Sequence, residues 1–343
     1  MTRVTSARGR ATVAAVATLT LLAVAVGYVV YAVRRQDRAA SAPPAPAAAV
    51  SLAPGPRLLV RDARPGPGRG RLATVERTDP AGPRQASALE CERVYAAAAT
   101  GLCLRARHGL TIEYEALVLD QRLRERARIS LPGAPSRARV SPSGRMVSWT
   151  VFVVGDSYTS TTMSTRTGIH DTRTGRTVEN LEMFAITRDG ARFRAADVNF
   201  WGVTFAPDDN TFYATLATGG STYLVRGDFA RRTVVTLKEN VECPSLSPDA
   251  TRLVYKKKVS DDPDHRWRLS VLELDSLTET QLAETQSVDD QAVWLDNRTV
   301  GYALPQRADA RFDVWSVPAD GSGEARLLVP DADSPAPLAA TTR

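Results

Sequence analysis

The chain has 343 residues, 43% hydrophobic and 24% charged, which is enough apolar material for a folded domain. Its net charge of +6 arises mostly within the first 38 residues, where six arginines and one aspartate give +5. Because the remaining chain is nearly neutral, nucleic acid is excluded as an expected partner.

Residues 11–33 form a run of 23 residues without a charge, preceded by a basic tail of residues 1–10. At about 1.5 Å per residue, such a helix spans a hydrocarbon core of roughly 30 Å. The alternative is a cleaved signal peptide, whose apolar region is normally shorter, about 7–15 residues. We therefore expect a retained transmembrane helix with the tail in the cytoplasm and the rest of the chain outside.

Residues 34–56 are rich in proline and alanine, a composition that cannot build a packed core. We expect a disordered stalk that holds a domain of residues 57–338 away from the membrane. Residues 339–343 are expected to be a short C-terminal tail.

Short apolar runs and turn clusters then alternate, the pattern of an all-β protein. One unit, a strand, a tight turn and a second strand, recurs along the chain. Proline followed by aspartate, asparagine or glycine is favourable turn chemistry. The turns lie in Val140–Gly144, Phe205–Asp209, Leu246–Ala250 and Val293–Asn297, with a weaker copy at Ala98–Gly101.

A second unit, an apolar strand that ends on aspartate before a polar turn, follows each copy of the first. Together the two units form a four-stranded antiparallel sheet, which cannot bury both faces alone. Several such sheets must therefore stack around a central channel. The repeats predict six blades.

The ends of the domain predict how the ring closes. The first blade begins at Arg57 without an innermost strand, and Ser334–Leu338 resembles an unpaired first strand after the last blade. If the last segment supplies the missing strand, the ring closes and no exposed sheet edge remains at the junction.

The segments SPSG (141–144), SPDA (247–250) and VWSVPADGSGEARLL (314–328) resemble the repeats of the TolB family of β-propellers. The resemblance covers roughly residues 58–338 and implies a six-bladed extracytoplasmic propeller that binds proteins on one face. The chain differs from TolB in lacking the α/β domain before the propeller and in having a membrane segment. The identity of the partner therefore does not follow from the resemblance.

Similar repeats precede the hydrolase domain of prolyl-oligopeptidase-type enzymes. A hydrolase of this type requires a G-x-S-x-G motif. The sequence contains no such motif, and the three histidines of the chain are scattered. The cysteine and histidine spacings match no zinc pattern. We therefore expect no catalytic residues, no metal site and no cofactor.

In a propeller, the loops that lead into the innermost strand of each blade lie on the same face as the loops that join the second and third strands of each blade. This face is here called the long-loop face. The longer connections are all of this kind, and function usually resides in such loops. They are Gly155–Thr165, Arg188–Asn199, Val259–Arg266 and Pro305–Arg311.

Aligning the innermost strands on their turns brings one set of residues to the channel mouth and a second set one step deeper. The mouth set is Glu92, Ser136, Trp201, Glu242 and Asp289. The deeper set is Arg93, Arg137, Gly202, Cys243 and Asp290. With the loop residues Asp156, Tyr158, Asp262 and His265, the charged and aromatic members of these sets are the candidate binding residues.

Two functions remain open at this point. The first is a monomeric protein- or peptide-binding module of the cell envelope that binds through the long-loop face. The second is an enzyme, a lyase or a glycosidase-like protein, that uses Glu242 and Asp289 as paired carboxylates. Structural ion pairing is a third interpretation of the same charged residues. We favour the binding module.

The three cysteines are expected to need no disulfide. Cys91 lies about eight residues before its turn and Cys103 about three after it. In a regular hairpin this places them some 15 Å apart, at roughly 3.3 Å per residue, beyond disulfide reach. Cys243 belongs to a blade across the channel from Cys91.

Overall fold

The computed structural model describes residues 50–338 apart from 110, 154–163 and 307–310, and in addition Leu21 and Gly27. The chain divides into two compact units, residues 1–47 and 48–343. None of the helices within the described residues has the length and apolar character that a membrane span requires. The predicted tail, membrane segment and C-terminal tail lie outside the described residues, apart from Leu21 and Gly27.

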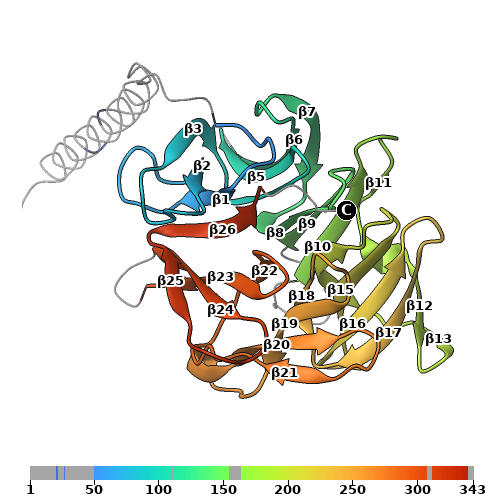
Figure 1. Ribbon diagram of the computed structural model, residues 1–343. Helices are drawn as coiled ribbons and strands as arrows, with labels where there is room; N and C mark the ends of the chain where they lie inside the picture. Colours follow the sequence, from blue (N-terminus) through green and yellow to red (C-terminus); the bar gives the residue numbers. More distant parts are fainter. Residues whose placement is uncertain are drawn as a thin grey trace, which may run out of the picture. The chain divides into compact units, whose positions relative to one another are not determined.

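The described part of the second unit consists of six sheets that follow one another around a ring, each with a core of four antiparallel strands (Figure 1). Blade 1 contains β26 (Ala332–Pro337), β1 (Arg57–Asp62), β2 (Arg71–Glu76) and β3 (Gln85–Glu90). Blade 2 contains β4 (Arg93–Ala97), β5 (Thr100–His108), β6 (Ile112–Leu119) and β7 (Glu125–Leu131). Blade 3 contains β8 (Ala134–Val140), β9 (Met146–Val153), β10 (Ser164–Asp171) and β11 (Thr177–Val178).

The second half of the ring repeats this order. Blade 4 contains β14 (Asn199–Phe205), β15 (Thr211–Thr218), β16 (Ser221–Asp228) and β17 (Thr233–Glu239). Blade 5 contains β18 (Glu242–Leu246), β19 (Arg252–Lys258), β20 (Trp267–Glu273) and β21 (Glu279–Gln281). Blade 6 contains β22 (Val293–Trp294), β23 (Thr299–Pro305), β24 (Phe312–Pro318) and β25 (Arg326–Val329). Two short 3-10 helices are η1 (Leu181–Met183) and η2 (Pro263–His265).

Blade 4 differs from the expected four strands. Residues 188–193, the first half of the segment 188–199 that was predicted as a loop, belong to a hairpin of β12 (Ala185–Arg188) and β13 (Ala191–Phe193). Its first strand pairs in parallel with β17, the outermost strand of the blade, and gives a six-stranded sheet. Asp189 and Gly190 both have positive φ, which fits the tight turn between the two strands.

The recurring turns have the predicted chemistry. The third residue after the Ser or Ala that opens each turn has positive φ: Gly144 at 80°, Asp209 at 56° and Ala250 at 58°. In blade 5 the N–H of Ala250 donates to the carbonyl of Ser247 at 2.9 Å. At Gly144 a Cβ atom would lie 3.1 Å from the carbonyl oxygen of Ala98 in blade 2, so glycine suits both the backbone and the contact.

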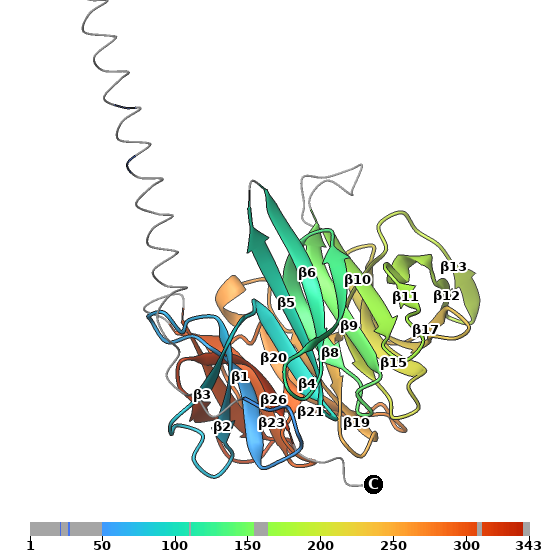
Figure 2. The same ribbon diagram turned by 90° about the horizontal axis from the view of Figure 1, so that it is seen from above.

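Six clusters of buried apolar side chains in the described residues lie between neighbouring blades. Trp149 packs between blades 2 and 3, and Phe200 and Phe212 pack between blades 3 and 4. Tyr255 lies between blades 4 and 5, and Tyr302 between blades 5 and 6. Each sheet therefore buries its faces against its neighbours, as the repeat pattern predicts (Figure 2).

The ring closes by the predicted strand exchange. β26 pairs antiparallel with β1, with Leu59 opposite Ala336 and Leu58 opposite Pro337. Figure 1 shows the last strand, in red, beside the first, in blue. An ion pair of 2.7 Å between Arg61 and Asp333 joins the same two strands.

The chain just before β1 packs on the propeller, so the compact unit starts ahead of the expected boundary at Arg57. Leu52 is fully buried, and its N–H donates to the carbonyl of Gln121 in blade 2 at 2.8 Å. The N–H of Gly55 donates to the carbonyl of Leu338 at 2.7 Å. The described end of the predicted stalk, residues 50–56, therefore packs into the propeller.

The expectation of no disulfide is wrong, because Cys91 and Cys103 are bonded, with 5.5 Å between their Cα atoms. The turn is at Ala98–Ala99, as expected, but β4 begins only at Arg93. Cys91 lies in the crossover from blade 1, where its N–H donates to the carbonyl of Gly70. The chain bends there, so the strand geometry that gave 15 Å does not apply. Cys243 is free and buried in blade 5.

Candidate functional site

A cavity of about 1530 Å³ opens at the channel mouth on the long-loop face. Its walls come from blades 2 to 6, because each innermost strand enters the channel from this face. The structure brings together here the predicted residues Arg93, Arg137, Trp201, Glu242, Asp289 and His265.

Bulges in the innermost strands aim side chains at the mouth. The ladder is interrupted between Trp201 and Thr204 in β14, and between Glu242 and Ser245 in β18. Within these bulges Gly202 and Cys243 have positive φ, 66° and 49°. A Cβ atom on Gly202 would lie 2.7 Å from the Cα of Cys243, so the two bulges are in direct contact.

Lys256 forms the centre of the floor. Its Nζ lies 2.5 Å from Asp289 Oδ1 and 3.7 Å from Glu242 Oε2, and its side chain is only 4% exposed. It reaches this position because Lys256 pairs with Glu242 in the β18–β19 ladder. The ammonium also lies 4.0 Å from the ring centroid of Trp267, a cation–π contact. The two carboxylates therefore share one buried cation.

These contacts set the protonation of the floor. Burial raises the pKa of the Asp289 carboxyl, whereas Lys256 and then Arg137 lower it by more, so the net shift is downward. Burial lowers the pKa of Lys256, but Cys243 and Asp289 raise it above its usual value. The Asp289 carboxylate and the Lys256 ammonium are therefore both charged at neutral pH.

Arg137 reaches across the channel from blade 3 to blade 6. Its Nη2 lies 3.6 Å from Asp289 Oδ1 and donates to the Asp289 carbonyl at 3.4 Å. Arg93 approaches from blade 2 and lies 4.0 Å from Asp333 of β26. Lys256 of blade 5 and Arg137 of blade 3 thus both pair with Asp289, and Arg93 of blade 2 also contributes to lowering the pKa of Asp289.

One step below this layer, a buried glutamine braces the channel. Gln291 Nε2 donates to the carbonyl of Val203 in blade 4 at 3.1 Å and to that of Pro244 in blade 5 at 2.9 Å. The innermost strands have no further strand beside them, so these carbonyls need side-chain donors. Gln291 thereby links the innermost strands of blades 4 and 5 to the start of blade 6.

Aromatic side chains from four blades line the cavity. They are Phe152 of blade 3, Trp201 of blade 4, Trp267 of blade 5 and Phe312 of blade 6. Phe152 is 37% exposed although it is a large apolar residue. The chain has only 22 aromatic residues, from 8 Phe, 5 Trp and 9 Tyr, so four around one cavity is a concentration. We call this set the aromatic rim.

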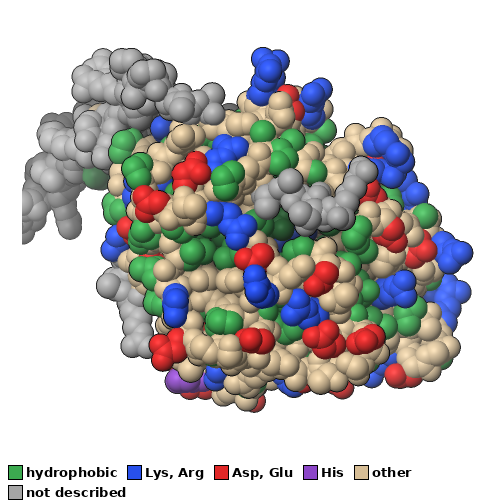
Figure 3. All heavy atoms as spheres, in the orientation of Figure 1, with side chains coloured by type: hydrophobic (Ala, Val, Ile, Leu, Met, Phe, Trp, Pro, Cys, Tyr) green, Lys and Arg blue, Asp and Glu red, His purple; other side chains and the backbone are tan. Residues whose placement is uncertain are grey.

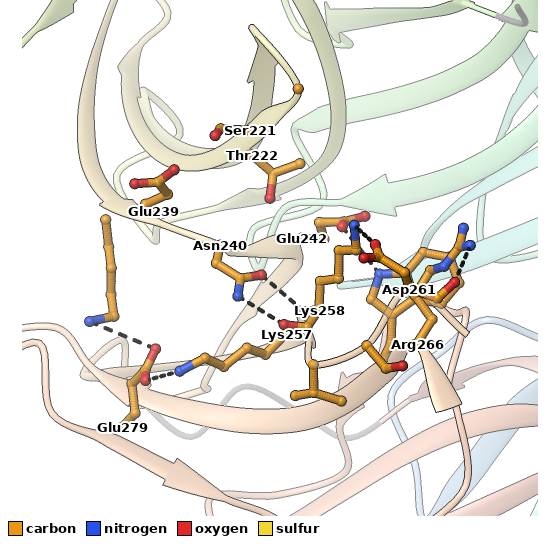
Figure 4. Close-up of a pocket in the computed structure, with 15 residues that line it drawn as sticks. Ser221, Thr222, Glu239, Asn240, Glu242, Lys257, Lys258, Asp261, Arg266 and Glu279 are labelled. Carbon is orange, nitrogen blue, oxygen red and sulfur yellow. Dashed lines mark hydrogen bonds and ion pairs between the residues drawn. The ribbon is translucent and has the colours of Figure 1, made fainter. Parts of the chain in front are cut away.

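A second cavity of about 810 Å³ adjoins the first between blades 4 and 5, and the two share Glu242, Arg266 and Trp267 (Figure 4). Its wall contains three paired lysines. Lys257 Nζ lies 2.5 Å from Glu279, which Lys238 also approaches at 3.7 Å. Figure 3 shows acidic and basic side chains interspersed over one face of the propeller.

Not every predicted residue reaches the mouth. Glu92 is exposed and Asp290 accepts from the N–H of Ala303 at 3.1 Å, and neither lines the cavity. Asp262 caps η2, and its Oδ2 lies 3.1 Å from Nδ1 of His265. It does not line the cavity. Asp156 and Tyr158 lie outside the described residues. No group of acidic, histidine or cysteine side chains that could hold a metal occurs among the described residues.

Sequence reasoning missed Lys256 and Trp267, which occupy the centre of the site. A usable signal was present, because the chain has four lysines against forty arginines. All four lysines line one of the two cavities. Lysine is rare in this chain and clusters on blades 4 and 5, so the lysines could have marked the site as well as the carboxylates did.

Replacement of Lys256 by methionine tests the buried floor. We expect Lys256→Met to lower the free energy of unfolding by roughly 2 kcal/mol, because Glu242 and Asp289 lose their shared cation. This is below the ~3–5 kcal/mol of a fully buried pair, since Asp289 keeps 61% of its side chain exposed.

Urea unfolding of the full chain, followed by tryptophan fluorescence, provides the measurement. The matched control is Lys258→Met, whose ion pair with Asp261 is largely exposed and should contribute under ~1 kcal/mol. Equal losses in the two variants would contradict a structural role for Lys256.

Six blades of four core strands, a channel and strand exchange at the closure define a six-bladed β-propeller. No protein-family model and no curated protein sequence matches the chain. Among solved structures, TolB from Acinetobacter baumannii is similar over 83% of this chain and 67% of its own, with 17% identity and a TM-score of 0.53. A chain of the nidogen/laminin complex is similar over 82% of this chain and 98% of its own, with 12% identity and a TM-score of 0.54. The fold is therefore a TolB-like β-propeller.

Proposed function

We propose that this chain is a membrane-anchored, extracytoplasmic propeller that binds a protein or peptide of the cell envelope through its long-loop face. The observation that carries the proposal is the cavity of about 1530 Å³ at the channel mouth, with its aromatic rim above a charged floor. Pockets that combine aromatic walls with a few fixed polar groups are typical binding sites.

The composition of the cavity suits a polypeptide ligand. Phe152, Trp201 and Phe312 offer large contact area at low cost in side-chain entropy, as residues that dominate protein interfaces do. The charged groups of the floor are held in place by their own ion pairs. Charges at fixed positions favour a ligand with complementary charges over other ligands. One of the structures with this shape comes from a protein–protein complex, that of nidogen and laminin.

The proposed location rests on the residues before the propeller. The run of 23 uncharged residues at 11–33 is long enough to remain as an anchor, and the Pro/Ala-rich stretch after it suits a spacer. With the propeller monomeric and outside, the long-loop face is available to envelope partners.

Catalysis forms no part of the proposal. A glycosidase-like pair needs one carboxyl group with a raised pKa to act as the acid. Lys256 instead lies against both Glu242 and Asp289, and the pKa of Asp289 is lowered. The pair is suited to holding charge in place.

Site-specific photo-cross-linking in intact cells tests the proposal with the full chain. A photoreactive amino acid at Phe312, on the aromatic rim, is expected to give one discrete adduct with an envelope protein. The same probe at Arg173, in the turn after β10 on the opposite face, is the control and should give none. Protease added outside the cells should digest the propeller.

Two results would reject the binding face. One is adducts of equal yield at both positions, and the other is adduct formation at Phe312 that survives the rim substitution Trp201→Ala unchanged. Protection of the propeller from external protease would reject the location separately.

A further inference from the structure

The charges that line the cavity at the channel mouth do not balance. With histidine counted as neutral, four of the described lining side chains are cations and three are carboxylates: Arg93, Arg137, Lys256 and Arg266 against Glu242, Asp264 and Asp289. Asp264 and Arg266 both belong to η2 and its C-terminal cap on blade 5, so their charges offset each other there. The excess positive charge therefore belongs to the remaining lining groups.

On the side of blades 5 and 6, the remaining charges compensate one another. Lys256 lies 2.5 Å from Asp289 and 3.7 Å from Glu242. Arg137 lies 3.6 Å from Asp289, so two cations face two carboxylates at ion-pair distance. A charged group of a ligand would have to break one of these pairs to bind here, and the loss of a partner leaves a charge uncompensated, which is unfavourable.

Arg93 of blade 2 carries the charge that is left over. Within the described ranges of the chain, its one partner at ion-pair distance is Asp333, at 4.0 Å. That carboxylate is only 1% exposed and already pairs with Arg61 at 2.7 Å, so two arginines share one aspartate. Arg61 does not line the cavity, whereas Arg93 does and keeps 27% of its side chain exposed. The excess positive charge consequently faces the cavity.

Arg93 has the geometry to select a carboxylate among the groups of a peptide. A guanidinium presents paired N–H donors that match the two oxygens of a carboxylate, and the attraction is stronger where water is partly excluded. Phe152 of the neighbouring blade 3 and Trp201 line the same cavity, so an apolar side chain beside the carboxylate has a surface on which to pack. In a polypeptide the carboxylate comes from Asp, from Glu or from the chain end.

We propose that the mouth selects polypeptide segments that present a carboxylate to Arg93, beside an apolar residue that packs on the aromatic rim. Arg93 determines this specificity, while Lys256 and Arg137 hold the charges of the floor. The proposal rests on the proposed peptide-binding function, which it narrows to acidic segments. Because the recognition is electrostatic, the preference weakens as the salt concentration rises.

Selection from random peptide libraries tests the preference. The full chain, immobilised in a mild detergent, is presented with one library that has free N-termini and one that has free C-termini. We expect Asp and Glu to be enriched at least about twofold among the selected peptides, and Lys and Arg to be depleted. Peptides selected only from the library with free C-termini would assign the carboxylate to the chain end.

A selected peptide then tests Arg93 itself, with isothermal titration calorimetry as the measurement. Replacing the carboxylate of the peptide by an amide should weaken binding to the wild type roughly tenfold. The same replacement should not change binding to Arg93→Gln, whereas Arg93→Lys, which keeps the charge, should retain part of the preference. Arg192→Gln, at an exposed arginine of β13, is the matched control and should behave as the wild type.

Arg93→Gln should fold, because Asp333 keeps its pair with Arg61, and its melting temperature verifies this. If it does not fold, the selection with the wild type still decides. Selected peptides rich in Lys and Arg, or without any charge preference in both libraries, would overturn the proposal. So would an equal effect of the amide on the wild type and on Arg93→Gln. A wild-type chain that selects no more peptides than Trp201→Ala would instead reject the proposed binding function, and this specificity with it.

Discussion

A chain that stops after Val329 should lose most of its folding stability, because it cannot close the ring. The truncation removes β26, with the fully buried Ala332 and Ala336 and the nearly buried Leu338. It also leaves β1 with a free edge and Arg61 without Asp333. We expect a loss on the order of 5 kcal/mol or more, against the ~5–15 kcal/mol that stabilises a typical domain.

Urea unfolding and size-exclusion chromatography measure this effect. A chain that ends at Leu338 is the control and should match the full chain. The single substitution Ala336→Asp, which places a charge in the core between blades 1 and 2, should lower stability in the same direction. A truncated chain with unchanged midpoint and elution volume would show that the closure contributes nothing.

Loss of the Cys91–Cys103 disulfide should have the second-largest effect. The bond closes a loop of 12 residues in sequence, for which the chain-entropy relation gives about 3 kcal/mol. The double variant Cys91→Ala with Cys103→Ala should therefore melt roughly 6 °C or more below the wild type. The bond joins the crossover after blade 1 to β5, so it also secures the blade beside the closure.

A reducing agent provides the internal control. It should lower the melting temperature of the wild type and leave that of the double variant unchanged. Mass spectrometry of the unreduced, alkylated chain should show a peptide that contains both cysteines. If that peptide is missing, the bond does not form in the protein.

Turn motifs made the fold predictable. Pro-Asp and Ser-Gly turns specify local backbone angles, and their positive-φ residues appear at Gly144, Asp209 and Ala250 as the chemistry requires. The count of strands left the first blade without an innermost strand and one unpaired strand after the last blade. Because sheet edges must be paired, the exchange of β26 followed. The turns depend only on residues that are neighbours in sequence, and the strand exchange follows from the number of strands.

The parts that were missed depend on contacts between segments far apart in sequence. Cys91 was assigned to a straight strand, but its direction is set by Gly70 and Arg61 in the neighbouring blade. The role of Lys256 depends on Asp289, which belongs to the next blade. The pattern of apolar residues in the sequence indicates neither the bend at Cys91 nor the ion pair between Lys256 and Asp289.

The exchange of β26 also fixes the order in which the protein can be completed. Arg61 and Asp333, which pair across the closure, are 272 residues apart in sequence. At roughly 5–20 residues per second, synthesis separates these two residues by tens of seconds. Throughout that interval blade 1 lacks its innermost strand and exposes an unpaired edge, the kind of surface that recruits other chains. The five blades between can assemble in sequence, but completion of the ring is the last event, and it depends on a contact of very high sequence separation, which makes it slow.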